Sequence, residues 1–237
     1  MSLPDPRRWV ADAMTLANGI FGFLSVLTWA VELGPLSSLP DPAVAAAYIG
    51  LGVVADGLDG VVARAWGSTG VGDALDSICD ALTFSVAPAV FLVNVNEMVD
   101  GLVFRSALSL AAVALVLAGM LRLARHRTGG STAVFHGLPT PWSAAALITV
   151  LLLGMPGWIS VGLAFLLAGL NLSPVPYPKT RGAVFTRAAL GLAVASLLVI
   201  GGLLVFQQTP DSLLWLAAIV AIGLVLLAPI AAPTGET

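Results

Sequence analysis

Charged side chains are scarce in this sequence: they make up 10% of its 237 residues, whereas hydrophobic residues make up 58%. Soluble domains usually carry about a quarter charged residues, so this chain is poorly suited to water. Apolar stretches that could cross a ~30 Å hydrocarbon core, which takes roughly 20 residues, recur along the sequence. The composition therefore predicts an integral membrane protein.

Several other kinds of site lack the residues they need. The single cysteine, Cys79, cannot form an internal disulfide, and His126 and His136 do not have the spacing of zinc ligands. The net charge of −3 gives no general attraction to nucleic acid. No nucleic-acid partner, disulfide framework or zinc site is therefore expected.

Breaks at Gly, Pro and charged residues predict one all-α domain over residues 1–237, a polytopic membrane bundle of about eight transmembrane helices. The fifth and sixth helices are short and separated only by the turn Met155–Trp158, and residues 2–12 could form a short interfacial helix. The first apolar run is too long for the core of a signal peptide. The expected helices are 13–33, 42–66, 72–96, 103–126, 139–155, 157–173, 183–206 and 212–232.

The basic residues predict the orientation, because membrane proteins keep positive charge on the cytoplasmic side. With both termini in the cytoplasm, only Arg105 of the ten basic residues lies on the opposite face. We therefore expect a multi-pass protein of the cell membrane whose active site faces the cytoplasm. The cytoplasmic basic residues are then Arg7, Arg8, Arg64, Arg122, Arg125, Arg127, Lys179, Arg181 and Arg187.

Five of the thirteen acidic residues fall between Val54 and Pro88. On the second helix, one face carries two of these acids, and the next helix carries two more at a spacing of four. A short loop between antiparallel helices brings these four carboxylates together near the cytoplasmic surface. The residues on the two faces are Asp56, Asp59, Gly60, Ala63 and Arg64, and then Gly72, Asp76 and Asp80.

Four carboxylates in one place repel each other, and hydrocarbon penalises each by several kcal/mol, so they need bound cations, shared protons or water. Oxygen ligands alone favour Mg²⁺, Mn²⁺ or Ca²⁺ over zinc. Gly60 and Gly72 leave room for a bulky ligand, and Arg64 adds a cation suited to phosphate. The combination indicates a site for a pyrophosphate substrate and two metal ions.

The pattern D-x2-D-G-x2-A-R followed by G-x3-D-x3-D, which runs from Asp56 to Asp80, resembles the signature of the CDP-alcohol phosphatidyltransferase family. The loop before Gly72 is one residue shorter than is usual there. The resemblance implies a homodimer, and Mg²⁺ or Mn²⁺ on Asp56, Asp59 and Asp76 with Asp80 close by. It implies that Asp80 is the general base. It also implies that the CDP-lipid is held by Asp59, Gly60, Ala63, Arg64, Gly72 and Asp76.

Other stretches resemble the phosphatidylserine synthase branch: LDSICDALTFSVAPAV, which overlaps the aspartate signature, and, on the acceptor side at about residues 120–182, GMLRLARHR, FHGLPTPWSAA and VPYPKTRG. TLANGIFG (Thr15–Gly22) resembles its first-helix T-x-x-N-x-x-x-G pattern, whereas Ser85 replaces a usual glycine and His126 a usual aromatic residue. The resemblance implies transfer of a phosphatidyl-type group from CDP-diacylglycerol or CDP-archaeol to L-serine with release of CMP. The C-terminal helices, 183–232, add nothing specific.

The acceptor side leaves alternatives open. Arg122 and Arg125, three residues apart, suit the serine carboxylate, or they anchor the helix end at the headgroups. Asn18 could contact the CDP-lipid or bond across helices. The acceptor could be another alcohol, glycerol 3-phosphate or inositol phosphate, and the acids could instead form the ion path of a cation or proton transporter. The sequence shows no clear nucleophile–base pair, so if the protein is an enzyme we expect transfer by single displacement, without a covalent enzyme intermediate.

Overall fold

The computed structural model describes residues 8–30, 41–67, 69, 71–128 and 134–178. Two of the expected helices, 183–206 and 212–232, lie outside the described residues. So do the basic residues Arg7, Lys179, Arg181 and Arg187.

The described part of the chain is helical, as the sequence predicts. Four helical spans are long and apolar enough to cross a membrane: Arg8–Thr28, Pro42–Trp66, Gly72–Val95 and Leu102–His126. Two shorter apolar helices follow, α6 (Thr140–Leu152) and α7 (Gly157–Leu172), separated by the predicted turn. A multi-pass helical membrane protein is thus confirmed, while the total of eight helices stays a prediction.

The first helix, α1 (Arg8–Thr28), begins and ends about one turn earlier than the predicted 13–33. No Gly or Pro interrupts the chain between Trp9 and Met14, so the expected interfacial segment continues directly into the first span. The apolar run was a poor guide to the helix start because Asp12 is polar and yet only 4% exposed. This correction moves Asp12 and Thr15 into the first turns of a membrane-spanning helix.

The third span consists of α3 (Gly72–Ala81), a π-helical segment η2 (Leu82–Val86) and α4 (Ala87–Val95). Pro88 has no backbone N–H to donate to the carbonyl of Phe84, which lies within η2. Such π-helical segments often occur at functional sites. Here the segment begins two residues after Asp80.

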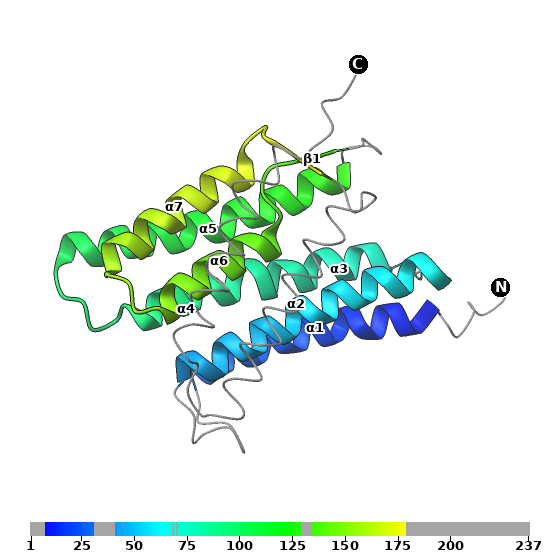
Figure 1. Ribbon diagram of the computed structural model, residues 1–237, viewed down its shortest axis with the longest axis horizontal. Helices are drawn as coiled ribbons and strands as arrows, with labels where there is room; N and C mark the ends of the chain where they lie inside the picture. The colour runs from blue at the N-terminus through cyan, green and yellow to red at the C-terminus, as the bar shows by residue number, and fades with distance from the viewer. Residues whose placement is uncertain (1–7, 31–40, 68, 70, 129–133, 179–237) are drawn as a thin grey trace.

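Glycines bring the first three spans into close contact. α1 packs along α2 (Asp41–Trp66) and against α3 and η2, and these helices lie side by side in Figure 1. A methyl group on Gly19 would lie 2.7 Å from Cys79 Sγ, and one on Gly22 would lie 2.7 Å from Thr83 Cα. Small residues of this kind let helix backbones approach closely in membranes.

The second half of the bundle is built on α5 (Leu102–Thr128), which packs against α7 and α4, while α6 packs against α4 and α7. Edge-to-face aromatic pairs join these helices: Phe104 and Trp158 have ring centroids 5.1 Å apart. The fully buried Phe91 of α4 makes the same kind of contact with Trp29, at 5.5 Å.

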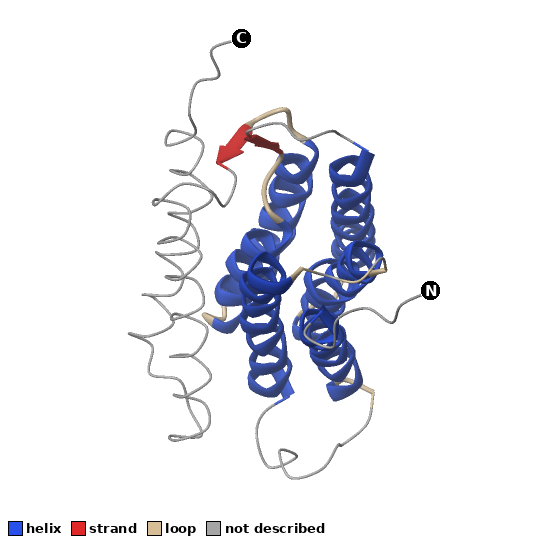
Figure 2. Ribbon diagram, turned by 90° about the vertical axis from the view of Figure 1, so that its right-hand side faces the viewer, coloured by secondary structure: helices blue, strands red, loops and turns tan. Residues whose placement is uncertain are grey.

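A two-stranded antiparallel sheet lies at one end of the bundle (Figure 2) and was not predicted from the sequence. β1 (Val134–His136) pairs with β2 (Pro176–Pro178), so that Phe135 is opposite Tyr177. Tyr177 packs edge-to-face on Trp142 at 6.2 Å. Burial raises the pKa of the Tyr177 phenol, so the ring stays neutral at physiological pH.

Candidate active site

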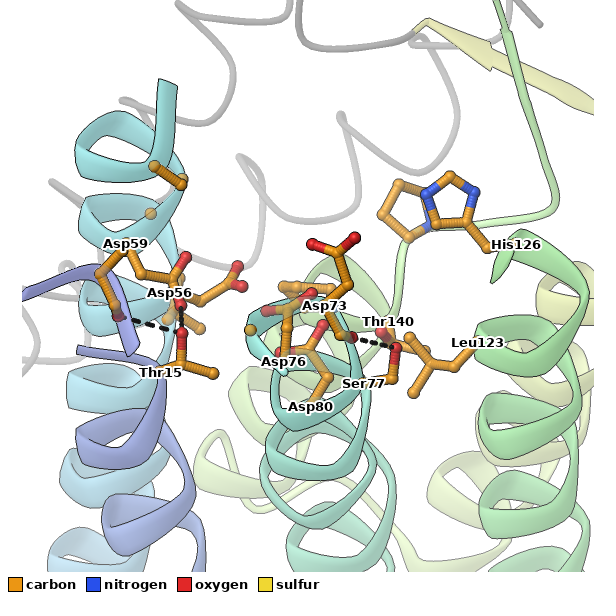
Figure 3. Close-up of a pocket in the computed structure, with 18 of the residues that line it drawn as sticks. Thr15, Asp56, Asp59, Asp73, Asp76, Ser77, Asp80, Leu123, His126 and Thr140 are labelled. Atoms are coloured by element: carbon orange, nitrogen blue, oxygen red, sulfur yellow. Dashed lines mark hydrogen bonds between the residues drawn. The ribbon is translucent and has the colours of Figure 1, made fainter. Parts of the chain in front are cut away.

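Five helices present polar residues at the same end of the bundle. The N-terminal turns of α1, α3 and α6 lie beside the C-terminal turns of α2 and α5, because neighbouring helices run in opposite directions. Between them is a cavity of about 410 Å³. Figure 3 shows Asp56 and Asp59 projecting from α2, opposite Asp76 and Asp80 on α3, with His126 of α5 across the opening.

Three of the predicted acids form a tight group. Carboxylate oxygens of Asp56, Asp76 and Asp80 lie within 4.8 Å of one another, and Asp80 is only 8% exposed. All the donors are carboxylate oxygens, which are the ligands that Mg²⁺ and Mn²⁺ prefer. The group therefore fits a hard divalent cation.

Asp59 lines the same cavity, but it is held separately from the other three acids. It is 7% exposed, and its Oδ2 accepts a hydrogen bond of 2.8 Å from Thr15 Oγ1. The same hydroxyl is 3.1 Å from the carbonyl oxygen of Ala11, one turn earlier on α1. Thr15 thus fixes Asp59 from the neighbouring helix.

Asn18, one turn further along α1, contacts Asp80. Its Nδ2 donates a hydrogen bond of 2.9 Å to Asp80 Oδ1, and the side chain is fully buried. Its backbone carbonyl accepts a hydrogen bond of 2.9 Å from Thr83 Oγ1 in η2. Asn18 does not itself line the cavity.

The two arginines proposed for the acceptor side lie in different surroundings. Arg122 lines the cavity, is only 7% exposed, and lies 3.5 Å from Thr140 Oγ1 through one terminal nitrogen. Its charge interacts favourably with those of Asp80 and Asp56. Arg125 is exposed, does not line the cavity, and donates to the carbonyl oxygen of Leu172 across 3.4 Å.

The cavity wall also includes Asp12, a buried acid outside the signature. Its Oδ2 accepts a short hydrogen bond from the hydroxyl of Thr69, which lies in the loop between α2 and α3. Gly67, with φ +80°, ends α2 just before this loop, a conformation that glycine adopts without strain. The shortened loop is therefore attached to α1 through Asp12.

A model of the CDP-alcohol phosphatidyltransferase family matches residues 8–175. The chain belongs to this family. It is 34% identical over 177 residues to a CDP-diacylglycerol–serine O-phosphatidyltransferase of Methanocaldococcus jannaschii, covering 74% of this chain and 77% of that one.

Two further relatives differ in the products that their names give. Identity is 33% to an archaetidylserine synthase of Methanothermobacter thermautotrophicus, over 72% of this chain and 70% of the relative. The chain is 27% identical to a phosphatidylcholine synthase of Pseudomonas aeruginosa, over 86% of this chain and 82% of the relative. The chain is thus a membrane enzyme of phospholipid synthesis, and the transporter interpretation is set aside.

All eight residues of the family signature line the cavity, so the helical spacing predicted their common placement correctly. Thr15, Asp12 and Thr140 were missed as site residues. Thr15 belongs to the T-x-x-N-x-x-x-G pattern of α1, which was the available signal, and Thr140 lies in the G-L-P-T-P-W stretch. The signature residues in the cavity are Asp56, Asp59, Gly60, Ala63, Arg64, Gly72, Asp76 and Asp80.

Proposed function

We propose that this enzyme transfers a phosphatidyl-type group from a CDP-lipid, CDP-diacylglycerol or CDP-archaeol, to L-serine and releases CMP. The observation that carries the proposal is one cavity that holds both the family signature and a buried arginine, Arg122. The names of two relatives, a CDP-diacylglycerol–serine O-phosphatidyltransferase and an archaetidylserine synthase, support serine as the acceptor.

On the donor side, the chain would bind the nucleotide and pyrophosphate between α2 and α3. Arg64 is exposed at the end of α2 and lines the cavity, where its fixed positive charge suits phosphate. Gly60, Ala63 and Gly72 line the same wall with little or no side chain, which leaves room for the ligand. Asp59 and Asp76 complete the predicted CDP-lipid contacts, and contact by Asn18 stays a prediction.

A divalent ion, Mg²⁺ or Mn²⁺, fits the group formed by Asp56, Asp76 and Asp80, with Asp59 nearby as a fourth predicted ligand. When bound, such an ion neutralises charge on the pyrophosphate and on the leaving CMP. The four aspartates line the cavity, and Thr15 holds Asp59 in place by a hydrogen bond.

The reaction would be a single displacement at the lipid-side phosphorus. Asp80 would accept the proton of the serine hydroxyl as its oxygen attacks that phosphorus. A new bond then joins the serine oxygen to the lipid-side phosphorus, and the bond from this phosphorus to the bridging oxygen breaks. That oxygen leaves with CMP. Asp80 is suited to the role because it lines the cavity near Arg122, the candidate ligand for the serine carboxylate.

Arg122 is the better of the two candidates for the serine carboxylate. It is buried in the cavity wall near Asp80, where bound serine would bring its hydroxyl to the base. Arg125, exposed and bonded to the end of α7, suits a role at the membrane surface. Thr140, buried beside Arg122, could add a hydroxyl contact to the same ligand.

Choline is a second candidate acceptor, because a phosphatidylcholine synthase is among the relatives. Choline has no carboxylate, however, and its quaternary ammonium would be repelled by a buried arginine. The buried charge of Arg122 therefore favours serine. Glycerol 3-phosphate and inositol phosphate are less well matched, because they would add phosphate charge beside four carboxylates.

We infer that the cavity faces the cytoplasm and that the enzyme forms a homodimer. The orientation is supported by Arg8, Arg64, Arg122 and Arg125, which lie at the cavity end of their helices, while Arg105 lies at the opposite end of α5. The orientation is tested by replacing Cys79 with Ser, placing one cysteine at position 66 or 98, and labelling it in sealed vesicles.

One assay tests the proposed function. The purified enzyme is incubated with CDP-diacylglycerol or CDP-archaeol and Mn²⁺, and CMP release is followed with serine, choline, glycerol 3-phosphate or inositol phosphate. Release of CMP with serine, with formation of the matching serine lipid, is the expected result. Turnover with another alcohol and none with serine would overturn the proposed acceptor.

A further inference from the structure

We propose that Asn18 is a positioning residue for the transfer reaction: its side-chain amide holds the carboxylate of Asp80 in the orientation that accepts the proton of the acceptor hydroxyl. This inference rests on the proposed function, in which Asp80 is the base. It assigns Asn18 a task on the catalytic base rather than on the substrate. The residue lies on α1, outside the aspartate signature.

The contact is specific in its direction. Asn18 Nδ2 is a donor, and it lies 2.9 Å from Asp80 Oδ1. An amide turned the other way would place its carbonyl oxygen against a carboxylate oxygen, which is repulsive. The hydrogen bond therefore engages Oδ1 of Asp80 and leaves Oδ2 available to accept the proton of the acceptor hydroxyl.

Asn18 is itself firmly held. The residue is completely buried, and its carbonyl accepts the hydrogen bond from Thr83 Oγ1 at 2.9 Å. On the other side is Gly52 of α2: a methyl group there would lie 3.1 Å from Asn18 Oδ1 and 2.5 Å from Thr83 Cγ2. The backbone of Asn18 is thus bonded to η2, and α2 lies close to its side chain, whose own hydrogen bond in the described structure goes to Asp80. The burial of this side chain leaves the amide little room to turn away from Asp80.

Orientation matters because a carboxylate rotates easily about its side-chain bonds. Misplacement of a reacting group by about 1 Å can cost on the order of a hundredfold in rate. Residues that orient metal-binding carboxylates and histidines through hydrogen bonds typically contribute about 10- to 100-fold in metal affinity or activity. An effect of this size on turnover is what the contact predicts.

Thr15 and Asn18 lie one turn apart on α1 and contact different acids, Asp59 and Asp80. In the proposed mechanism Asp59 serves the CDP-lipid, whereas Asp80 serves the chemical step. Loss of the Thr15 contact should therefore weaken CDP-lipid binding, and loss of the Asn18 contact should slow turnover. Substitutions at these two residues of the same helix should therefore change different quantities, the KM for CDP-lipid in one case and kcat in the other.

The decisive variant is Asn18→Leu, which keeps the branching at Cγ and the number of side-chain heavy atoms but has no donor. We expect kcat to fall by about 10- to 100-fold, with the KM for CDP-lipid changed by less than about threefold. CMP binding, measured by calorimetry with Mn²⁺ present, should be retained, because Asn18 does not itself line the cavity. Asn18→Ser, which keeps a shorter donor, should lie between Asn18→Leu and the unmodified enzyme.

Thr83→Val is the matched control, since it removes the hydrogen bond to the Asn18 carbonyl and keeps the shape of the packing. It should retain turnover within about threefold. Normal kcat in Asn18→Leu would overturn the inference. The inference would also be overturned if Asn18→Leu, Asn18→Ser and Thr83→Val all lost kcat and CMP binding to the same extent, because that result would indicate a general loss of packing.

Asp80→Asn separates this inference from the proposed function. An Asp80→Asn enzyme that binds CMP and lacks turnover leaves Asp80 as the base, and the Asn18 variants then test the positioning role alone. An Asp80→Asn enzyme with near-normal turnover means that Asp80 is not the base, whatever the Asn18 variants do.

Discussion

Ser85 of η2 faces Gly119 of α5 so closely that a methyl group on Gly119 would overlap the Ser85 hydroxyl oxygen. Both residues are buried. Outside Ser85, the nearest atom to that methyl group would be Thr140 Cγ2, at 3.6 Å, which is an ordinary contact. Gly119 thus provides the space for serine at a position where the phosphatidylserine synthase branch usually has glycine.

Gly119→Ala should destabilise the enzyme, because overpacking a well-packed interior typically costs about 1–3 kcal/mol. Adding Ser85→Gly to the same protein should restore most of the lost stability, since it removes the atoms that the new methyl group meets. Thermal unfolding in detergent, followed for both single variants and the double variant, measures this coupling. Additive losses in the double variant would contradict it.

The placement of the signature residues could be predicted from the sequence, because it depends only on helical spacing and a short loop. Asp56, Asp59 and Arg64 share one face of α2, and all three line the cavity as expected. The grouping within the cavity could not be predicted. Asp59 is separated from Asp56, Asp76 and Asp80 by its bond to Thr15, which depends on how α1 packs.

Tertiary packing also explains the other differences. The contact of Asn18 with Asp80 depends on Gly22 and Gly52, which let α1 and α2 approach η2 closely. The β1–β2 pair joins segments about forty residues apart through Val134–His136 and Pro176–Pro178, which carry no alternating pattern. The sequence could not distinguish Arg122 from Arg125 either, because their spacing suits both to the serine carboxylate. Only the packing of the helices shows that Arg122 is buried and Arg125 is exposed.

Thr15→Val should weaken the binding of CDP-lipid. The variant keeps the shape of the side chain and removes the hydroxyl that donates to Asp59. Hydrogen bonds to charged groups contribute about 1.5–3 kcal/mol, so we expect the KM for CDP-lipid to rise by roughly ten- to a hundredfold, with a smaller change in kcat.

Thr28→Val is the control for this change on the same helix. The Thr28 hydroxyl donates only to the carbonyl of Leu24 in the described structure, at 2.9 Å, and lies far along α1 from the cavity. Its kinetics should match those of the unmodified enzyme. If Thr15→Val and the unmodified enzyme had the same KM for CDP-lipid, Thr15 would have no role in binding this substrate.

Asp76→Asn should abolish turnover, because Asp76 belongs to the group of three acids within 4.8 Å. Asp73→Asn provides a comparison: Asp73 lines the same cavity from the same helix but is exposed and lies outside that group. We expect Asp73→Asn to retain most activity. Turnover and CMP binding are measured for both, and a fully active Asp76→Asn would contradict the assigned ligand set.

Removal of divalent metal should abolish turnover, and Mg²⁺ or Mn²⁺ should restore it. The reason is the ligand set: carboxylate oxygens alone favour hard cations. CMP binding should show the same dependence, which provides a measurement independent of turnover. Undiminished CMP release in excess chelator would refute a metal-dependent reaction.

Arg122→Lys and Arg125→Lys should differ in their effect on serine. Lysine keeps the positive charge but loses the two-pronged geometry of a guanidinium. Losing one charge-assisted contact typically costs about 1.5–3 kcal/mol, so Arg122→Lys should raise the KM for serine by roughly ten- to a hundredfold. The KM for CDP-lipid should change much less, because other residues hold that substrate. Arg125→Lys should leave both values unchanged, since Arg125 is exposed and does not line the cavity.

Separate measurement of the two KM values on each purified variant distinguishes substrate binding from a role at the membrane surface. If Arg125 is an anchor, Arg125→Ala should lower the yield of inserted protein while the surviving enzyme has normal kinetics. For Arg122, poor insertion is not the expected result, because the residue is buried next to Thr140 and interacts with Asp80 and Asp56. An unchanged KM for serine in Arg122→Lys would mean that the acceptor carboxylate binds elsewhere in the cavity, and Arg64 would then be the next cation to test.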